Sequence, residues 1–559
     1  MNMSEALLGA TVPKAAPESA HSDVVASLFR EISSRTGLPS GPASAEGAAS
    51  DAIPGSHSVP PASESSPVAP SVHSGFGAAP EGNCGYVTPS IPISFAPFGS
   101  EVLKSLHDFG LEGPTARAVL HEAEVSDQPD YYFLDRPPQP AALDHSPTGG
   151  LPPPVATFDV EAVRRDFPAL QQRIHGHPLV YLDNAATTQK PQAVIDATSH
   201  FYENDNAPVH RAAYELAERA TTAFENARQR VSEFLGAKDK KEIVFTRGTT
   251  EAINLVANTF GRKFIGEGDE VLLTELEHHA NIVPWQLLRE QTGAVIKVVP
   301  INDRGELILE EYAKLLGPRT KLVSVAHVSN ALGTINPIEQ IIALAHARGV
   351  HVLIDGAQST PHIPINVQTL DADFFVFSGH KIFGPTGVGA LYGKAHLLET
   401  LPPWQGGGHM IKDVRFEKTV FQHPPEKFEA GTPDIAGAVG LGAAIEYLLK
   451  LGIPALAAYE HSLLEYATPL LLGVPGLRLI GTATNKASVL SFILDGHSNE
   501  DIAKHLDRQG IAVRAGHHCA LPAQRHFGLE STVRPSLAFY NNRADVDALV
   551  QTLHSLIRK

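Results

Sequence analysis

Cysteine is almost absent from this sequence, because the 559 residues contain only Cys84 and Cys519. Two thiols cannot form a disulfide framework, which excludes small cross-linked secreted domains and fits a reducing cytosol. A basic excess is also missing: the net charge is −17, which argues against binding to nucleic-acid phosphates. No apolar run is long enough to cross a membrane, and the first residues lack a secretory signal. We therefore expect a cytoplasmic chain that binds neither nucleic acid nor membrane.

The first 155 residues differ in composition from the rest, since they hold 22 of the 43 prolines and no tryptophan. Such a segment cannot bury enough apolar surface to offset its chain entropy, so we expect 1–155 to be a disordered Pro/Ala/Ser-rich arm. Three short apolar islands, 26–38, 90–111 and 130–138, are candidates for docking to a partner, and a plain spacer is the alternative. Cys84 lies in this arm without fixed neighbours to lower its pKa, so we assign it no catalysis.

Residues from about Phe158 onward have a globular composition, with apolar strands that alternate with helical patterns. Strands that are apolar throughout and separated by helices are typical of a mostly parallel sheet covered on both faces, the α/β class. We expect VGALYG, 388–393, to be a further edge strand of this sheet. We assign 178–446 to a large domain. We assign 157–177 and 447–559 to a smaller α/β domain.

Polar residues follow the strands of the expected sheet at the points where the strands end. Ligands of such sheets bind at the carboxyl ends of the strands, so five polar strand ends in one sheet predict a single site. The residues concerned are Thr249, Thr250, His278, His279, Asn330, Asp355, Gln358, Ser378, His380 and Lys381.

Lys381 follows a buried strand in the stretch DFFVFSGHKIFGPTG. Burial lowers the pKa of a lysine and makes its amine a nucleophile, although a strand-end lysine can also reach solvent along its stem. An amine, a carboxylate, an imidazole and hydroxyl donors together suit pyridoxal phosphate (PLP). Lys381 would bind its aldehyde, Asp355 would pair with its pyridine nitrogen and His278 would stack on its ring. The expected phosphate donors are Thr249, Thr250, Ser378 and His380, with helix capping as the alternative for the two threonines.

Eight motifs extend this pattern, in the order YLDNAATTQKP, RGTTEAINLVAN, EHHANIVPW, HVSNALGT, DGAQS, FSGHKIFGPTG, FEAGTPD and RAGHHCALP. Together they resemble the SufS-type, or class II, cysteine desulfurases, which are fold-type-I PLP enzymes, over residues 157–559. The resemblance implies a large domain with a mostly parallel seven-stranded sheet and a smaller C-terminal α/β domain. It also implies PLP as cofactor, L-cysteine as substrate, and a homodimer.

The resemblance assigns further roles residue by residue. Lys381 would move protons as acid and base, and Asn330 and Gln358 would hydrogen-bond the cofactor and the substrate. Thr432 would reach the phosphate of the neighbouring subunit, and Arg534 would bind the substrate carboxylate through a bidentate pair. Two further residues that line the family's site are His210 and Arg514. No metal site is expected.

Cys519 would be the sulfur acceptor of such an enzyme. Its thiolate would attack the substrate sulfur and become a persulfide while alanine leaves, and the neighbours Arg514, His517 and His518 would favour the thiolate. An inert buried cysteine is the alternative. The sulfur could then pass to an iron–sulfur scaffold system, to a relay protein or to a stored pool.

Two features depart from the family. The chain has His-Arg-Ala at 210–212 where members often have His-Arg-Gly, and the added methyl group would narrow the mouth of the site. The long arm resembles that of cargo desulfurases of family 2 encapsulin shells, so 1–155 would direct packaging into such a shell. A selenocysteine lyase on the same scaffold and an inactive protein that interacts through its arm are the alternatives.

Overall fold

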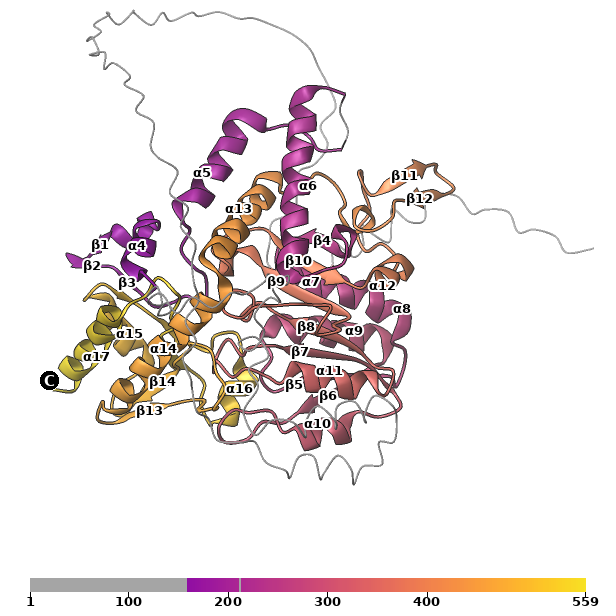
Figure 1. Ribbon diagram of the computed structural model, residues 1–559. Helices are drawn as coiled ribbons and strands as arrows, with labels where there is room; N and C mark the ends of the chain where they lie inside the picture. Colours follow the sequence, from indigo (N-terminus) through magenta and orange to yellow (C-terminus); the bar gives the residue numbers. More distant parts are fainter. Residues whose placement is uncertain (1–157, 211–212, 559) are drawn as a thin grey trace, which may run out of the picture. The chain divides into compact units, whose positions relative to one another are not determined.

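The computed structural model describes residues 158–210 and 213–558, which belong to one compact unit (Figure 1). The expected arm with its apolar islands and Cys84 lies outside the described residues, as do Arg211 and Ala212 of the His-Arg-Ala departure. Within the described part, no single helix is long and apolar enough to cross a membrane. Only Ile435–Leu451 and Ile453–Leu472, counted as a pair across a 76° bend, reach that length.

A seven-stranded sheet organises the first part of the described chain, as predicted. Its order is β4-β10-β9-β8-β7-β5-β6, and the only antiparallel pairings are the two made by β10. The strands are β4 (Ile243–Thr246), β5 (Glu270–Thr274), β6 (Val295–Val299), β7 (Thr320–Ala326), β8 (His351–Asp355), β9 (Phe374–Ser378) and β10 (Gly389–Gly393).

The prediction that 388–393 forms an edge strand was wrong, because β10 lies between β4 and β9. Gly389 makes this interior position possible. A Cβ atom there would lie 2.5 Å from the carbonyl oxygen of Phe377 and 2.6 Å from Cα of Gly248, so only glycine fits between the neighbouring strands. The glycines of VGALYG therefore mark close backbone approach rather than an exposed edge.

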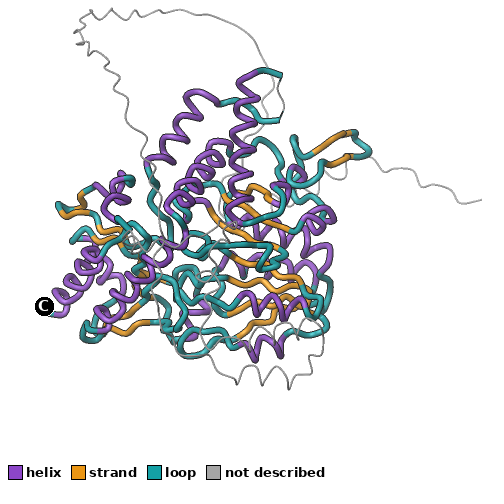
Figure 2. The backbone as a smooth tube through the Cα atoms, viewed as in Figure 1, coloured by secondary structure: helices purple, strands orange, loops and turns teal. Residues whose placement is uncertain are grey.

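Successive residues of each strand face opposite sides of the sheet, and a separate hydrophobic core forms on each side. Phe375 and Phe377 pack in one core with α6, α10, α11 and α13, whereas Phe374 and Val376 pack in the other with α7, α9 and α12. Figure 2 shows helices on both sides of the strands. The helices are α6 (Glu215–Leu235), α7 (Thr249–Val256), α9 (Val283–Thr292), α10 (Leu309–Leu315), α11 (Ile338–His346), α12 (Ala395–Thr400) and α13 (Ile435–Leu451).

A four-stranded antiparallel sheet lies in the C-terminal part, in the order β13-β14-β17-β16. Its strands are β13 (Leu477–Leu479), β14 (Phe492–Leu494), β16 (Arg514–Gly516) and β17 (Thr532–Arg534). It shares a core with α14 (Ile453–Leu472), α15 (Asn499–Asp507) and α17 (Arg543–Ile557). The N-terminal strand β3 (Val180–Tyr181) pairs in parallel with β15 (Ile511–Ala512), so the start of the described chain joins this C-terminal part.

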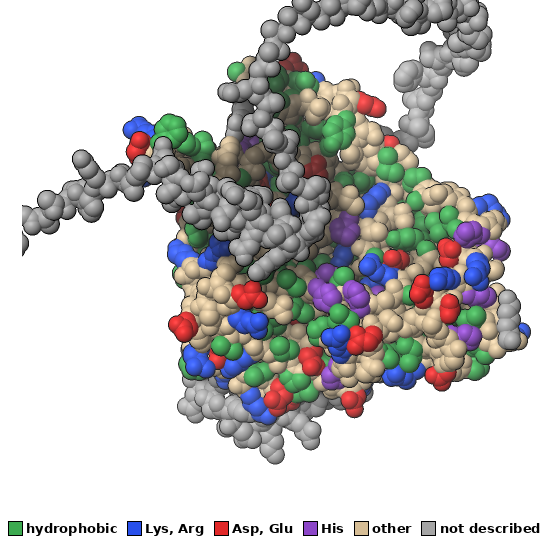
Figure 3. Space-filling view, turned by 180° about the vertical axis from the view of Figure 1, so that it is seen from behind, with side chains coloured by type: hydrophobic (Ala, Val, Ile, Leu, Met, Phe, Trp, Pro, Cys, Tyr) green, Lys and Arg blue, Asp and Glu red, His purple; other side chains and the backbone are tan. Residues whose placement is uncertain are grey.

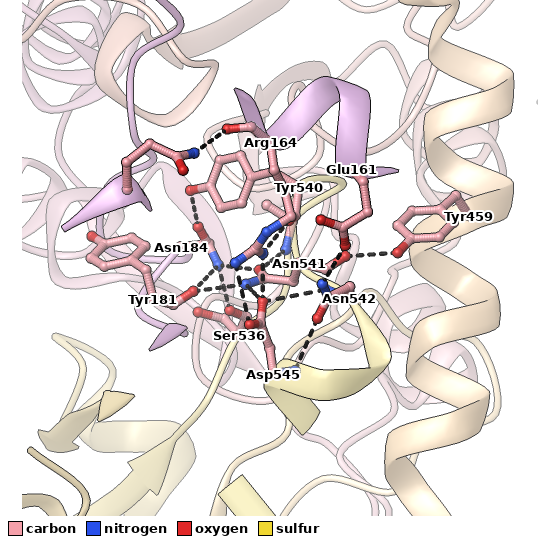
Figure 4. A network of polar contacts seen from close by, with 12 residues as sticks. Glu161, Arg164, Tyr181, Asn184, Tyr459, Ser536, Tyr540, Asn541, Asn542 and Asp545 are labelled. Carbon is pink, nitrogen blue, oxygen red and sulfur yellow. Dashed lines mark hydrogen bonds and ion pairs between the residues drawn. The ribbon is translucent and has the colours of Figure 1, made fainter. Parts of the chain in front are cut away.

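A buried polar network fastens α4 (Val160–Arg165) and the segment after β3 to the start of α17 (Figure 4). Arg164 Nη1 donates to Asp545 Oδ2 at 2.8 Å, and Asn541 Nδ2 donates to the carbonyl oxygen of Tyr181 at 3.0 Å. Asn184 Nδ2 donates to Asn541 Oδ1 at 3.0 Å. The network fixes the backbone on either side of Asp183, whose side chain enters the candidate site.

The remaining elements are short. They are β1 (Arg173–Ile174), β2 (His177–Pro178), β11 (Ile411–Val414), β12 (Thr419–Phe421), α5 (Gln192–His200), α8 (Arg262–Phe264), α16 (Leu521–His526), η1 (Pro168–Gln171), η2 (Phe201–Asp205), η3 (Lys240–Glu242), η4 (Ala257–Gly261), η5 (His279–Asn281), η6 (Gly379–Lys381) and η7 (Glu426–Phe428). On the face drawn in Figure 3, acidic and basic side chains are interspersed, so this face offers no broad cationic surface to a phosphate backbone.

Candidate active site

Lys381 and Asp355 lie at the carboxyl ends of neighbouring parallel strands, β9 and β8. Burial lowers the pKa of Lys381 to about 8, and the negative charge of Asp355 opposes this shift. Asp355 is 5% exposed; burial raises its pKa, while a hydrogen bond from the Ala357 N–H and the charge of Lys381 act in the opposite direction. The amine is therefore available in its neutral, nucleophilic form near physiological pH, with a carboxylate close by.

The peptide before Lys381 is anchored by the motif that follows β3. The carbonyl oxygen of His380 accepts hydrogen bonds from Thr188 N at 3.1 Å, Thr187 Oγ1 at 3.0 Å and Lys190 Nζ at 3.1 Å. Burial lowers the pKa of Lys190 to about 8. These contacts hold the Lys381 backbone in place. No role was predicted from the sequence for Thr187, Thr188 or Lys190, although all three lie in the motif YLDNAATTQKP.

The Gly-Thr-Thr turn forms a cradle at the start of α7. Thr249 N donates to Ser378 Oγ at 2.9 Å, and Ser378 Oγ donates to Thr249 Oγ1 at 2.9 Å. Gly248 has a φ of +144°, and a Cβ atom there would lie 3.0 Å from Ser378 Oγ, so glycine keeps the turn open. Thr250 is exposed. Backbone and hydroxyl donors at a helix N-terminus suit a phosphate group.

His278 and two amide side chains follow neighbouring strand ends. Burial lowers the pKa of His278 to about 3, so its ring is neutral, and its Nδ1 accepts from Ala280 N at 3.0 Å. Gln358 Nε2 donates to the carbonyl oxygen of Ala185 at 2.6 Å. Asn330 Nδ2 donates to the carbonyl oxygen of His518 at 2.6 Å and thereby ties this strand end to the loop of Cys519. Burial lowers the pKa of the His380 ring to about 4, and the charges of Lys381 and Lys190 act in the same direction.

Arg534 reaches the same strand ends from β17 and is 1% exposed. Its Nη2 donates to Asp183 Oδ1 at 3.0 Å, and its Nη1 donates to the carbonyl oxygen of Asn330 at 3.0 Å. Burial raises the pKa of Asp183, and Arg534 opposes this. No role was predicted for Asp183 from the sequence, because its partner Arg534 lies far away in the chain. The Asp183 carboxylate thus occupies one donor of the buried guanidinium.

Cys519 lies in the loop between β16 and α16 and is half-buried. Both His518 and Cys519 adopt left-handed backbone conformations, with φ of +53° and +55°. The carbonyl oxygen of Cys519 accepts from His279 N at 2.7 Å, which docks the loop onto the segment of His278. A negative charge on Cys519 would raise the pKa of Lys381, whereas the charges of Arg534 and Arg514 lower it.

Thr432 and His210 are two further predicted residues. Thr432 is exposed. His210 Nε2 pairs with Glu225 Oε1 at 3.2 Å, and its ring stacks on His409 with centroids 5.0 Å apart. His210 lines a cavity of about 980 Å³, and the described lining of that cavity includes neither Lys381 nor Cys519.

The remaining site residues fit PLP. The chain offers an amine of lowered pKa, a carboxylate for the pyridine nitrogen, a neutral imidazole for the ring face and a phosphate cradle. Asn330 Oδ1 and Arg534 Nε are buried, and within the described residues neither has a hydrogen-bond partner. Unpaired buried polar atoms are costly, and these two point to a bound ligand at this place.

Comparison with known proteins agrees with this geometry. The family model for class-V aminotransferases matches residues 180–549. A probable cysteine desulfurase of Mycolicibacterium paratuberculosis is 57% identical over 440 residues; the match covers 78% of this chain and 63% of that relative. A probable cysteine desulfurase of Vibrio cholerae is 50% identical over 400 residues, covering 72% of this chain and 99% of the relative.

The crystal structure of the cysteine desulfurase CsdA from Escherichia coli, in an S-sulfonic acid form, is 41% identical with a TM-score of 0.67. That match covers 72% of this chain and 99% of the other. A cysteine desulfurase of Thermococcus onnurineus is 38% identical with a TM-score of 0.68, covering 71% of this chain and 98% of the other. This chain belongs to the class-V aminotransferase family and, within it, to the cysteine desulfurases.

Proposed function

We propose that this protein removes the sulfur of L-cysteine, holds it as a persulfide on Cys519 and releases L-alanine. The observation that supports the proposal is that the Cys519 loop is bonded to the segments that follow the strand ends: Asn330 Nδ2 donates to the carbonyl oxygen of His518 at 2.6 Å, and His279 N donates to that of Cys519 at 2.7 Å. PLP is the cofactor, and when bound it withdraws electrons from the bonds at the substrate α carbon and makes the C–S bond labile.

Four groups of the chain would hold the cofactor. Lys381 Nζ binds its aldehyde, Asp355 keeps its pyridine nitrogen protonated and His278 covers its ring. The phosphate is held by Thr249, Ser378 and the free backbone donors at the start of α7. The contacts between His380 and the motif 187–190 keep the backbone of Lys381 fixed while its amine works.

Arg534 would bind and orient the substrate carboxylate. Its Nε has no partner within the described residues, and its Nη2 bonds Asp183. The incoming carboxylate takes the unpaired Nε donor and replaces or joins Asp183 at the guanidinium, giving the bidentate geometry that arginine favours. Because Arg534 also bonds the backbone of Asn330, this step places the substrate against the second orphaned atom, Asn330 Oδ1.

Lys381 and Cys519 then carry out the transfer. Lys381 Nζ, with its pKa of about 8, takes the proton from the substrate α carbon and returns one at the β carbon. The thiolate Sγ of Cys519 attacks the substrate sulfur: an S–S bond forms, the C–S bond breaks, and its electron pair stays with the β carbon. The Cys519 sulfur and the substrate sulfur each lose one electron, the β carbon gains these two electrons as it becomes a methyl group, and the third hydrogen of that methyl group balances the proton lost by the Cys519 thiol.

Replacement of the acceptor tests this proposal. Cys519→Ala should reduce alanine and sulfide formation from L-cysteine by about 100-fold or more, because the attacking nucleophile is gone. The absorbance of the bound cofactor should stay unchanged, since the thiol does not hold PLP. Cys84→Ala is the matched control, as it removes the other cysteine of the chain. Full turnover of L-cysteine by the Cys519→Ala protein would overturn the acceptor role.

We also propose a homodimer in which Thr432 and His210 serve the neighbouring subunit. Thr432 is exposed, and His210 borders a cavity away from Lys381. The persulfide would pass to a sulfur-acceptor protein, with iron–sulfur cluster assembly as one destination. Mass measurement in solution that gave only a monomer with full PLP affinity would overturn the subunit-sharing arrangement.

A further inference from the structure

Three metal-binding side chains meet at the mouth of the candidate site. His279, His517 and Cys519 each offer a ligand atom, and these three atoms all lie within 4.8 Å of one another. His279 begins η5, after strand β5, whereas His517 and Cys519 lie in the loop between β16 and α16. Because the segments are far apart in the chain, no short Cys/His spacing in the sequence announces this set.

The ring nitrogens of both histidines face the backbone of the Cys519 loop. His517 Nδ1 accepts from Cys519 N at 3.0 Å, and His279 Nε2 accepts from Leu521 N at 3.3 Å. A ring nitrogen that accepts a hydrogen bond is unprotonated, and an unprotonated nitrogen is the form that binds a metal ion. Each histidine thus directs a lone pair toward the segment that carries the thiol.

The two segments are already held together. His279 N donates to the carbonyl oxygen of Cys519 at 2.7 Å, and the rings of His279 and His517 stack with centroids 5.6 Å apart and planes 29° apart. His517 is exposed, and the other two residues are half-buried, so an ion can enter from solvent. Little backbone movement is needed for the three side chains to converge.

We propose that His279, His517 and Cys519 bind one thiophilic divalent cation, represented by Zn²⁺, and that the bound ion reversibly blocks the acceptor thiol. Sulfur and imidazole ligands with an open fourth position suit Zn²⁺, whose ligand atoms lie about 3.5 Å apart in a tetrahedral site. The thiol loses its proton to solvent as the S–Zn bond forms, and no electrons are transferred. When the ring nitrogens bind the metal, the backbone N–H groups of Cys519 and Leu521 lose these acceptors and donate hydrogen bonds to water instead.

The blocking effect rests on the proposed acceptor role of Cys519, whereas the binding site does not. A thiolate that is bonded to zinc cannot attack the substrate sulfur. Zinc should therefore inhibit alanine formation, because the bound ion occupies the thiolate that would attack the substrate. A chelator that removes the zinc should restore the rate in full.

Metal binding can be measured on the PLP-loaded, full-length protein without substrate. Zn²⁺ should bind one equivalent per chain in competition with a chromophoric chelator. Co²⁺ in its place should give the ligand-field bands of a tetrahedral site in the red part of the spectrum, away from the cofactor absorbance. Cys519→Ser and His517→Gln should each weaken this binding by more than about tenfold, the loss that even an outer-shell partner can cause. His526→Gln is the matched control, because His526 lies nearby on α16 and pairs with Glu275 instead.

The outcomes separate the two proposals. Equal zinc affinity in the wild-type, Cys519→Ser and His517→Gln proteins, or octahedral cobalt bands in all three, would overturn the metal site and leave the desulfurase function intact. Tetrahedral cobalt bands that vanish in both variants, combined with retained turnover in Cys519→Ala, would support the site and overturn the acceptor role. Zinc inhibition that is unchanged by His517→Gln would show inhibition at another place and count against the inference.

Discussion

Arg228 shows how a single buried charge is held on α6. It is 1% exposed, and its Nη1 and Nη2 donate to Glu429 Oε1 at 2.6 Å and Oε2 at 2.9 Å. Glu429 also accepts from Phe245 N at 2.7 Å. Burial opposes the charge, but Glu429 and Glu225 outweigh it and raise the pKa of Arg228. The pair fastens α6 and β4 to the segment that leads to Thr432.

Arg228→Met should lower the free energy of unfolding by about 3–5 kcal/mol, because it leaves the Glu429 carboxylate buried without its partner. The control is Arg230→Met on the same helix, where an exposed arginine pairs with Glu233 and Glu446. Its loss should leave the free energy of unfolding nearly unchanged, because solvent screens an exposed ion pair. Denaturant unfolding of both variants measures the difference. Similar midpoints for the two variants would contradict this account of the buried pair.

Charged groups lie near both ends of strand β9. Those at one end belong to the candidate active site, and those at the other end form a network of ion pairs. Lys381 follows its carboxyl end in the active site, whereas Asp373 precedes its first residue. Asp373 Oδ2 pairs with His346 Nε2 at 2.8 Å and lies 3.5 Å from His351 Nδ1, while its Oδ1 pairs with Lys394 Nζ at 3.0 Å. Lys394 and His346 also contact Asp371. This network ties α11, β8 and β10 to the start of β9, opposite the end that holds the chemistry.

The network predicts a stability that depends on pH. The hydrogen bond to Asp373 raises the pKa of His346. The stabilisation that protonated His346 gives the folded state is therefore complete below the pKa of histidine in the unfolded chain, about 6.5, and is lost as the pH rises through the pKa in the folded state. The His346 pair therefore adds a downward slope to the free energy of unfolding as the pH rises above about 6.5. His346→Gln should flatten this slope. His175→Gln, which removes a more exposed histidine paired with Asp507, should leave it in place. An unchanged slope in His346→Gln would contradict the assignment.

At the scale of the whole molecule, local patterns predicted the strands and their polar ends. Most strands of the central sheet are buried on both faces, with the edge strand β6 as the exception. Asp355 ends its strand and Lys381 comes three residues after the end of its own, so a short stretch of sequence carries the signal. Contacts between distant segments carry no such signal. The Asp183–Arg534 pair, the anchoring of the His380 carbonyl by Lys190 and the interior place of β10 all depend on how separate elements meet. They became visible only with the fold.

The long N-terminal segment gives the last prediction, since the family match begins at residue 180 and the described chain at 158. The match to the Vibrio cholerae relative covers 99% of that protein but 72% of this chain, so we expect the catalytic part to work without 1–155. A 156–559 truncation should therefore keep PLP and alanine formation.

We propose that the removed arm directs the enzyme into a family 2 encapsulin shell. Co-expression with such a shell should then package the full chain and leave the truncation outside, as measured by co-purification with intact shells. Equal packaging of both forms would remove the packaging role, whereas loss of activity on truncation would show that the arm supports catalysis.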